Sequence, residues 1–226
     1  ILRMFSQEIG YHKDFVIIDE DDSLGLIKAS LRDLKIDTTL RRFPSPSVLG
    51  SIISFARNSN RALEDVIFER FPYFEEEIDS IKAVAAGYDK KKKNSFAMDY
   101  DDLLENWVKL LRACPQARDY HAKRFKHILV DEYQDTNQIQ HELIHLLSRD
   151  HRNIFVVGDD AQSIYSFRAA NVQNILDFPK IFPDTKIFKL ETNYRSTTGI
   201  LDLANESILH NSKQFVKKLK SAAGDG

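Results

Sequence analysis

The sequence is poor in several features that mark particular classes of protein. Its one cysteine, Cys114, excludes a disulfide framework within the chain and fits a reducing, cytoplasmic compartment. Only eight glycines and six prolines occur in 226 residues, which excludes collagen-like and low-complexity chains. No stretch approaches the roughly 20 apolar residues that a membrane span needs, and no signal peptide opens the chain.

An excess of charge of one sign is absent as well. The chain carries 32 Lys and Arg against 34 Asp and Glu, a net charge of −2, so any contact with DNA must be local. This balance does not separate an enzyme from a binding protein. The 42% of hydrophobic residues can fill one sizeable core, or a core and a smaller second domain, and 11% aromatic residues argue against disorder.

Apolar residues at helical spacing predict a mostly helical first part of the chain. The stripes are Leu24, Ile27, Leu31 and Leu34, then Val48, Ile52, Phe55 and Ala56, then Phe74, Ile78, Ile81 and Val84. Ser23 is the expected cap of the first stripe, and residues 15–18 are a short strand candidate. Ile1, Leu2, Phe5 and Ile9 share the helical spacing, so we expect the chain to begin within a helix. Lys90–Ser95 is expected to be a solvated loop, with a DNA-facing loop as the alternative.

The pattern changes after residue 125, where strands and helices alternate three times. Short apolar runs at 127–131, 154–157 and 186–190 are each followed by a helical pattern, which predicts a parallel sheet with covering helices. A further helix is expected from Asp99 onward. Ligands bind at the carboxyl ends of parallel strands, so the polar residues after each run are the candidate site.

Asp131 and Glu132 follow the first run. One carboxylate can hold Mg²⁺ and the next can deprotonate an attacking water, as in a Walker B segment. The alternative is a strand that simply ends at the surface. Asp135, with Gln138 three residues later, is expected to cap the next helix.

The second and third apolar runs are followed by other kinds of side chains. Gly158 allows a sharp turn, and Gln162 is a neutral donor that can sense a phosphate. Tyr165 and Phe167 project to the same side if the segment is extended, which with Arg168 suits stacking on single-stranded bases; alternatively, both rings fill the core. Arg195 can reach a phosphoryl group, although pairing with a surface carboxylate is the alternative.

Four strings of residues resemble motifs of the UvrD/Rep/PcrA group of superfamily-one helicases. They are Asp131–Asn137, Gly158–Arg168, Leu190–Ser196 and Met98–Leu104, within a match over about residues 96–205. The resemblance implies a parent enzyme that uses ATP and Mg²⁺ to move 3′ to 5′ on single-stranded DNA or at a single/double-strand junction, with a place in DNA repair.

The resemblance also implies a role for each site residue. Asp131 would bind Mg²⁺, Glu132 would be the catalytic base, and Gln162 would contact the γ-phosphate. Tyr194 would stack on adenine and Arg195 would be the arginine finger. The residues implied in DNA binding are Tyr165, Phe167 and Arg168.

The implied fold is α/β: a partial RecA-like parallel sheet with covering helices, of the P-loop NTPase type, plus an all-α inserted subdomain. Residues 1–95 would form the inserted subdomain, 96–212 the C-terminal part of the first RecA-like domain, and 213–226 a linker.

Two residues depart from the family pattern. Phe167 stands where many members have Trp, and Ala169 stands where Gly is usual, although Ala tolerates a positive φ poorly. A larger departure is that G-x-x-x-x-G-K-[ST] does not occur: the residue five after each of the first six glycines is never glycine. We therefore expect the P-loop segment and the second motor domain to lie elsewhere in the parent chain, and the isolated chain to be inactive.

Two other interpretations stay open. A non-catalytic DNA-binding or scaffold protein with a degenerate motor fold would also lack the P-loop, and the gene upstream of Ile1 distinguishes it. An unrelated P-loop signalling ATPase leaves the aromatic residues of the second cluster unexplained.

Overall fold

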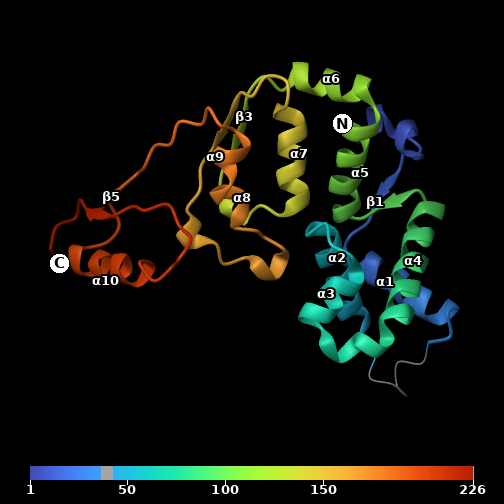
Figure 1. Cartoon of the computed structure of the whole chain (residues 1–226). Coiled ribbons are helices and arrows are strands. Elements are labelled where there is room, and N and C mark those ends of the chain that lie inside the picture. Colours follow the sequence, from blue (N-terminus) through green and yellow to red (C-terminus); the bar gives the residue numbers. More distant parts are fainter. Residues whose placement is uncertain (37–42, 226) are drawn as a thin grey trace. The chain divides into compact units, whose positions relative to one another are not determined.

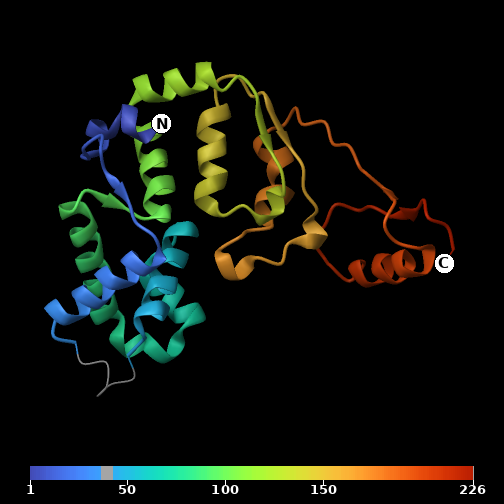
Figure 2. The same cartoon turned by 180° about the vertical axis from the view of Figure 1, so that it is seen from behind.

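The chain forms two compact units built from helices and very short strands (Figure 1 and, from behind, Figure 2). The computed structural model describes residues 1–36 and 43–225, so parts of the predicted inserted subdomain and linker, residues 37–42 and 226, lie outside it. Unit 1 comprises residues 1–128, 137–155 and 167–169, and unit 2 comprises residues 129–136, 156–166 and 170–226. Among the described residues, no helix is long and apolar enough to cross a membrane.

The first half of unit 1 is helical, as the apolar stripes predict. Its helices are α1 (Glu20–Asp33), α2 (Pro46–Asn58), α3 (Leu63–Arg70), the 3-10 helix η3 (Pro72–Glu77) and α4 (Ile78–Asn94). Their apolar faces meet in one core that includes Ile27, Leu49, Ile52, Ile67, Ile81 and Val84. The predicted cap Ser23 is wrong: Asp19 caps α1, because its Oδ1 accepts the backbone N–H of Asp22 at 2.9 Å.

The predicted loop at Lys90–Ser95 is also wrong, because α4 continues through Asn94. Lys92 lies on the inner face of this helix and is 1% exposed, whereas Lys93 is exposed. A run of four lysines therefore hides one buried residue, which composition alone does not reveal.

The second half of unit 1 consists of α5 (Tyr100–Ala113), α6 (Pro115–Arg124) and α7 (Gln138–Ser148). Helices α5 and α7 lie side by side in both views, and Val108, Leu111, Ile139, Leu143 and Leu147 form their shared core. The helix predicted from Asp99 onward is α5, and the structure shows that Asp99 and Asp102 form a capping box at its start. At α7 the cap is Asn137 with Gln140, so the predicted pair Asp135 and Gln138 is wrong.

The start of the chain forms two 3-10 helices, η1 (Leu2–Met4) and η2 (Ser6–Ile9), in place of the expected α-helical turn. Leu2 packs in a small core with Phe15, Met98 and Leu110.

The strands form three separate two-stranded sheets. They are β1 (Val16–Ile17) with β2 (Ala97–Met98), β3 (Ile128–Val130) with β4 (Ile154–Val156), and β5 (Thr192–Asn193) with β6 (Lys220–Ser221). The first and last pairs are parallel. The first two apolar runs form β3 and β4 as predicted, but their central residues are not buried: Leu129 is 73% and Phe155 is 57% exposed.

The prediction of a third strand at 186–190 is wrong, because that segment has no strand and β5 begins two residues later and pairs with β6. The described residues thus contain parallel strand pairs and covering helices, but no single sheet that joins all three runs.

Unit 2 contains a cluster of three aromatic rings, from Tyr133, Phe178 and Phe182. Tyr133, in η4 (Tyr133–Asp135), is fully buried, and its ring meets that of Phe178 edge-on at 5.4 Å. Burial raises the pKa of Tyr133 to about 12. Other elements of this unit are η5 (Asp160–Gln162), α8 (Gln173–Leu176), α9 (Phe178–Ile181) and α10 (Thr198–Ile208).

A fully buried histidine lies in the aromatic part of unit 1. The His121 ring stacks on Phe125 at 5.9 Å and meets Phe5 edge-on at 5.8 Å. Neither of its ring nitrogens has a hydrogen-bond partner among the described residues. Burial lowers the pKa of His121, because the charged form has no solvation there.

We predict that His121→Phe raises the free energy of unfolding by about 1 kcal/mol at pH 7. The variant removes the two buried ring nitrogens that have no hydrogen-bond partner in the wild type. The folded protein disfavours the protonated ring, so the native His121 loses stability as pH falls below about 6.5, the ordinary pKa of an unfolded histidine. The variant should therefore gain more at pH 5.5 than at pH 7.5 in urea unfolding. The exposed His12 offers the control His12→Phe, and an equal pH dependence in wild type and His121→Phe contradicts this account.

Candidate functional site

The end of β3 presents two exposed carboxylates on a strained turn. Asp131 Oδ1 accepts the backbone N–H of Glu132 at 2.9 Å. Glu132 has a φ of +50°, in the left-handed region that non-glycine residues rarely adopt. Such strain persists only where neighbouring contacts hold it, and it is concentrated at functional sites.

A second turn follows β4 in unit 2. Asp159 accepts the backbone N–H of Ala161 at 3.0 Å and the side-chain amide of Gln162 at 2.8 Å, and it pairs with Lys217. Burial alone would raise the pKa of Asp159, but the hydrogen bonds from Lys217 and Gln162 outweigh it and lower that pKa. Asp159 is therefore held charged, and it fixes the position of Gln162.

The buried side chain of Gln134 connects these two turns. Its Nε2 donates to Glu132 Oε2 at 2.7 Å and its Oε1 accepts the backbone N–H of Asp159 at 3.0 Å. The main chain adds a further link, because Tyr133 N–H donates to Val157 O at 2.9 Å. The structure thus brings the turn that carries Glu132 together with the turn that carries Gln162. Gln134 has no role that its sequence context predicts, since its partners lie up to 25 residues away.

Gly158 was predicted to allow a sharp turn; it has no positive φ, and what requires a glycine there is close packing. A Cβ atom there would lie 2.6 Å from Gln134 Oε1 and 2.7 Å from Ile175 Cδ1. Any side chain at residue 158 would push Gln134 aside.

The third predicted cluster lies on β5, which pairs with β6 and not with β3 or β4. Asn193 Oδ1 accepts the backbone N–H groups of Arg195 at 2.9 Å and Ser196 at 2.8 Å, which shapes this turn. Tyr194 is 82% exposed and Arg195 is exposed as well. The structure does not bring Tyr194 and Arg195 to the sheet edge at which Asp131 and Glu132 lie.

The carboxylate of Asp131 suits Mg²⁺ only in part. No group of three or more His, Cys, Asp or Glu that could hold a metal occurs among the described residues. Mg²⁺ in phosphate-transfer sites commonly uses one or two carboxylates, with water and substrate phosphates as the other ligands. Asp131 fits that limited role.

A cavity of about 570 Å³ in unit 1 gathers aromatic and polar side chains. Phe167 and Arg168 line it together with Tyr100 and Phe55, and the Arg168 guanidinium lies 5.5 Å from the centre of the Phe167 ring. Phe167 and Tyr100 are 60% and 66% exposed, so both rings can be reached from solvent. Tyr100 also lines the cavity, whereas its sequence context predicts only a place in the first turn of a helix.

The extended segment predicted for Tyr165 and Phe167 is wrong, because Ser166–Arg168 form a 3-10 turn, η6. Spacing by two residues therefore does not place the rings on one side. Tyr165 is 39% exposed and is not one of the residues that line this cavity. Ala169 has a φ of +64°, so the position at which the resemblance leads us to expect Gly does adopt the left-handed conformation.

Amide side chains organise one wall of this cavity. Asn58 Nδ2 donates to Asp101 Oδ1 at 2.8 Å, and Asn137 Nδ2 donates to Asn58 Oδ1 at 2.7 Å. These bonds tie the end of α2 to the starts of both α5 and α7.

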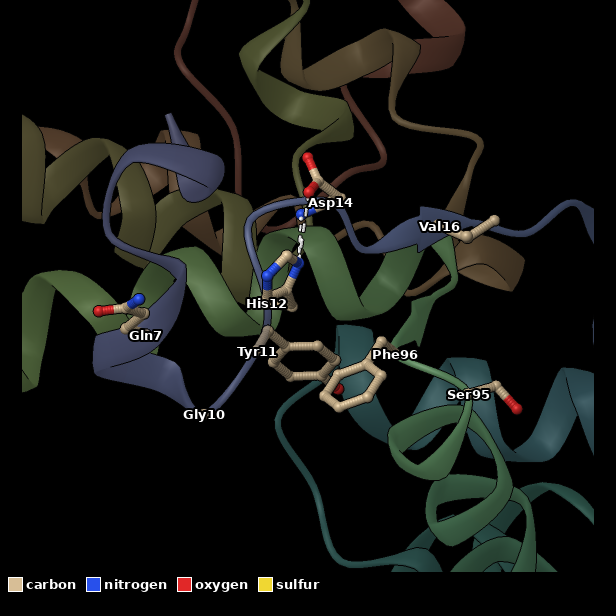
Figure 3. Close-up of a pocket in the computed structure, with 8 residues that line it drawn as sticks. All are labelled: Gln7, Gly10, Tyr11, His12, Asp14, Val16, Ser95 and Phe96. Atoms are coloured by element: carbon tan, nitrogen blue, oxygen red, sulfur yellow. Dashed lines mark hydrogen bonds and ion pairs between the residues drawn. The ribbon is translucent and has the colours of Figure 1, made fainter.

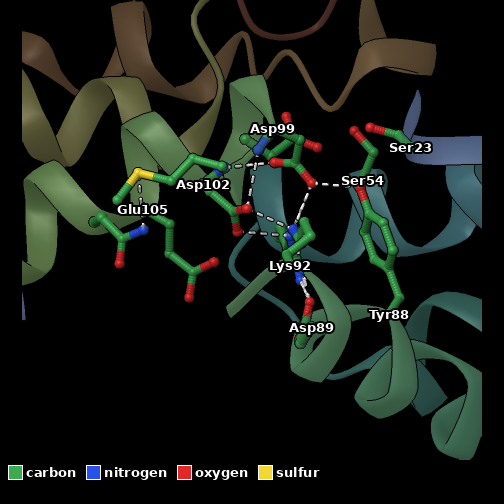
Figure 4. A network of polar contacts seen from close by, with 12 residues as sticks. Ser23, Ser54, Tyr88, Asp89, Lys92, Asp99, Asp102 and Glu105 are labelled. Carbon is green, nitrogen blue, oxygen red and sulfur yellow. Dashed lines mark hydrogen bonds and ion pairs between the residues drawn. The ribbon is translucent and has the colours of Figure 1, made fainter. Parts of the chain in front are cut away.

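A buried ion network lies beside the cavity (Figure 4). Lys92 Nζ contacts Asp99 at 2.5 Å and Asp102 at 2.6 Å, and Arg57 contacts Asp102 at 3.1 Å and also pairs with Asp89. Burial would raise the pKa of Asp99, but the charge of Lys92 and its hydrogen bond outweigh this effect and lower it. Burial and the neighbouring Asp99 raise the pKa of Asp102. The network joins α2, α4 and the start of α5.

Another cavity in unit 1, of about 620 Å³, lies between the η2 segment and the turn before β2 (Figure 3). The rings of Tyr11 and Phe96 line it, and His12 Nδ1 lies 3.4 Å from Asp14 Oδ2 at its exposed edge. None of the predicted site residues lines this cavity.

Comparison with known proteins decides the family. The family model of the UvrD/REP helicase N-terminal domain matches residues 1–183. This chain belongs to the UvrD/REP helicase family. It is 38% identical over all 226 residues to proteins named ATP-dependent DNA helicase PcrA, from Staphylococcus epidermidis and from Staphylococcus aureus. The chain spans about 30% of the length of these curated relatives.

The buried ion network of this UvrD/REP helicase chain can be tested by removing its central cation. Lys92→Met leaves Asp99 and Asp102 buried without their closest positive charge, so we expect it to lower the free energy of unfolding by about 3–5 kcal/mol. Lys93→Met, on the exposed face of the same helix, should change it by less than about 0.5 kcal/mol. Urea unfolding of both variants measures the difference. Equal stability of the two variants would show that the network contributes nothing.

Proposed function

We propose that this UvrD/REP helicase chain supplies half of the ATP site and part of the single-strand DNA track of an ATP-dependent DNA helicase that moves 3′ to 5′. The name of its PcrA relatives, ATP-dependent DNA helicase, supports this proposal. Residues 1–95 would be the inserted helical subdomain, 96–212 the later part of a RecA-like motor domain, and 213–226 a linker. The buried thiol of Cys114 is in keeping with a reducing, cytoplasmic setting.

At the ATP site, Asp131 would help to hold Mg²⁺, which would screen the phosphate charge. Glu132 would act as the general base toward the attacking water, and its strained backbone supports a functional role. Gln162 would contact the γ-phosphate. Tyr194 would stack on adenine and Arg195 would stabilise the transferred phosphoryl group, which requires the exposed β5 turn to face the nucleotide.

The chain contains no G-x-x-x-x-G-K-[ST] segment to hold the phosphates. We therefore propose that these 226 residues alone neither hydrolyse ATP nor unwind DNA, and that both activities need a P-loop and a second motor domain.

One observation carries the DNA part of the proposal: a cavity of about 570 Å³ collects Tyr100, Phe167, Arg168 and Phe55 in one place. Flat rings beside a guanidinium suit an unpaired base with its phosphate, because rings stack on any base and arginine pairs with phosphate. The size is typical of a pocket for a small ligand. Tyr165, in unit 2, would also contact the DNA.

Binding of a fluorescent oligo-dT to this chain tests the DNA track. We expect Tyr100→Ala to weaken binding about 5- to 150-fold, the effect of losing one base–aromatic stack. Tyr73, which is as exposed as Tyr100 at 66% but lies outside the cavity, gives the matched control Tyr73→Ala. Fluorescence anisotropy at fixed salt measures both affinities. Equal affinities of the two variants would exclude the cavity as a base site.

A further inference from the structure

We propose that Gln134 is a positioning residue, which orients the carboxylate of Glu132 and keeps it in register with the turn that carries Gln162. The inference rests on the roles proposed for Glu132 and Gln162. It concerns unit 2 alone, which contains all of these residues.

The hydrogen bonds of Gln134 define a single orientation of its amide. Nε2 donates to Glu132 Oε2 at 2.7 Å and to Asp135 Oδ2 at 3.2 Å, while Oε1 accepts the N–H of Asp159 at 3.0 Å. A flipped amide would direct its oxygen at two carboxylates and its N–H groups at another N–H. The side chain is 1% exposed, so solvent does not compensate for such a mismatch.

These bonds form a continuous chain from the proposed base to the proposed phosphate sensor. Gln134 binds Glu132 on one side and Asp159 on the other, and Asp159 Oδ2 accepts the side-chain amide of Gln162 at 2.8 Å. Ser163 adds a link from its hydroxyl to the backbone oxygen of Gln134 at 3.3 Å. A shift of the Gln162 turn therefore changes the support of the Glu132 carboxylate.

The hydrogen bond from Gln134 also gives the two carboxylate oxygens of Glu132 different roles. Oε2 accepts from Gln134, which leaves Oε1 to accept a proton from the attacking water. Glu132 lies in the left-handed region and is exposed, so its side chain depends on this bond for a defined direction.

Gly158 gives independent support, because its missing side chain makes room for Gln134. A Cβ atom there would stand 2.6 Å from Gln134 Oε1 and 3.2 Å from the backbone nitrogen of Tyr133. Gly158→Ala should therefore displace the amide without changing any group that faces the nucleotide.

ATP turnover of the complete gene product that contains this chain tests the inference. We expect Gln134→Leu to lower kcat about 10- to 100-fold while the KM for ATP changes less than about 3-fold, because orientation of the base matters to the chemical step and not to binding. Gln140→Leu is the matched control: it removes the same chemical group from the capping box of α7 and should leave kcat within about 2-fold.

The variant Gln134→Glu tests positioning through the pH dependence of kcat, which a merely structural role of Gln134 would not change. The charged form of the new side chain would repel Glu132 and Asp135, whereas its protonated form could donate a hydrogen bond to Glu132 in place of Nε2. We expect kcat of this variant, relative to wild type, to rise as pH is lowered from 8 to 6. A flat ratio would overturn the positioning role.

Glu132→Gln separates failure of this inference from failure of the proposed function. A loss of at least about 100-fold in kcat for Glu132→Gln, with Gln134→Leu within 2-fold of wild type, overturns the role of Gln134 alone. If Glu132→Gln itself stays within 2-fold, the proposed base is wrong.

NMR of this chain gives a measurement that does not depend on turnover. The side-chain amide protons of Gln134 should exchange with solvent at least about 10-fold more slowly than those of the exposed Gln7, and both Glu132→Ala and Gly158→Ala should remove this protection. Equal exchange rates of Gln134 and Gln7 in the wild-type chain would overturn the inference.

Discussion

A single buried carboxamide joins the two turns on which the proposed ATP site is built. A left-handed backbone at a non-glycine residue costs about 1–2 kcal/mol, and Glu132 adopts one at the end of β3. A hydrogen bond to a charged group contributes about 1.5–3 kcal/mol, which is enough to offset that strain. The bond from Gln134 to Glu132 is therefore of the right size to hold the turn, and its second bond, from Asp159, anchors it.

The cavity of unit 1 that we propose for DNA is stabilised in a different way. Lys92 and Arg57 lie among three carboxylates, and these ion pairs connect three helices. Buried ion pairs seldom add much net stability, but removing only one partner is costly. They therefore fix the positions of the helices relative to one another. The ion network lies next to the start of α5, where Tyr100 lines the cavity.

The sequence predicted the family, most helices and the first two strands, because long motifs and apolar periodicity depend on local order. It did not predict the third strand, since pairing of β5 with β6 depends on residues about 28 positions apart. It also missed the burial of Lys92, the hydrogen bond of Gln134 to Asp159 and the place of Tyr100 in the cavity, because their partners come from distant segments. Gly158 was singled out in the sequence for a turn, and the structure adds that the close approach of Gln134 and Ile175 leaves no room for a side chain there. At Ala169 the departure from glycine was seen in the sequence, and the positive φ shows why it matters.

The proposed half-site depends most directly on the backbone conformation of Glu132. The three-bond coupling between its amide and Cα protons, together with the chemical shifts of residues 131–135, reports φ in solution. We expect a positive φ near +50° that persists at neutral pH in this chain. A negative φ at Glu132 would mean that its carboxylate is not held by Gln134, and the proposed half-site would lose its geometric basis.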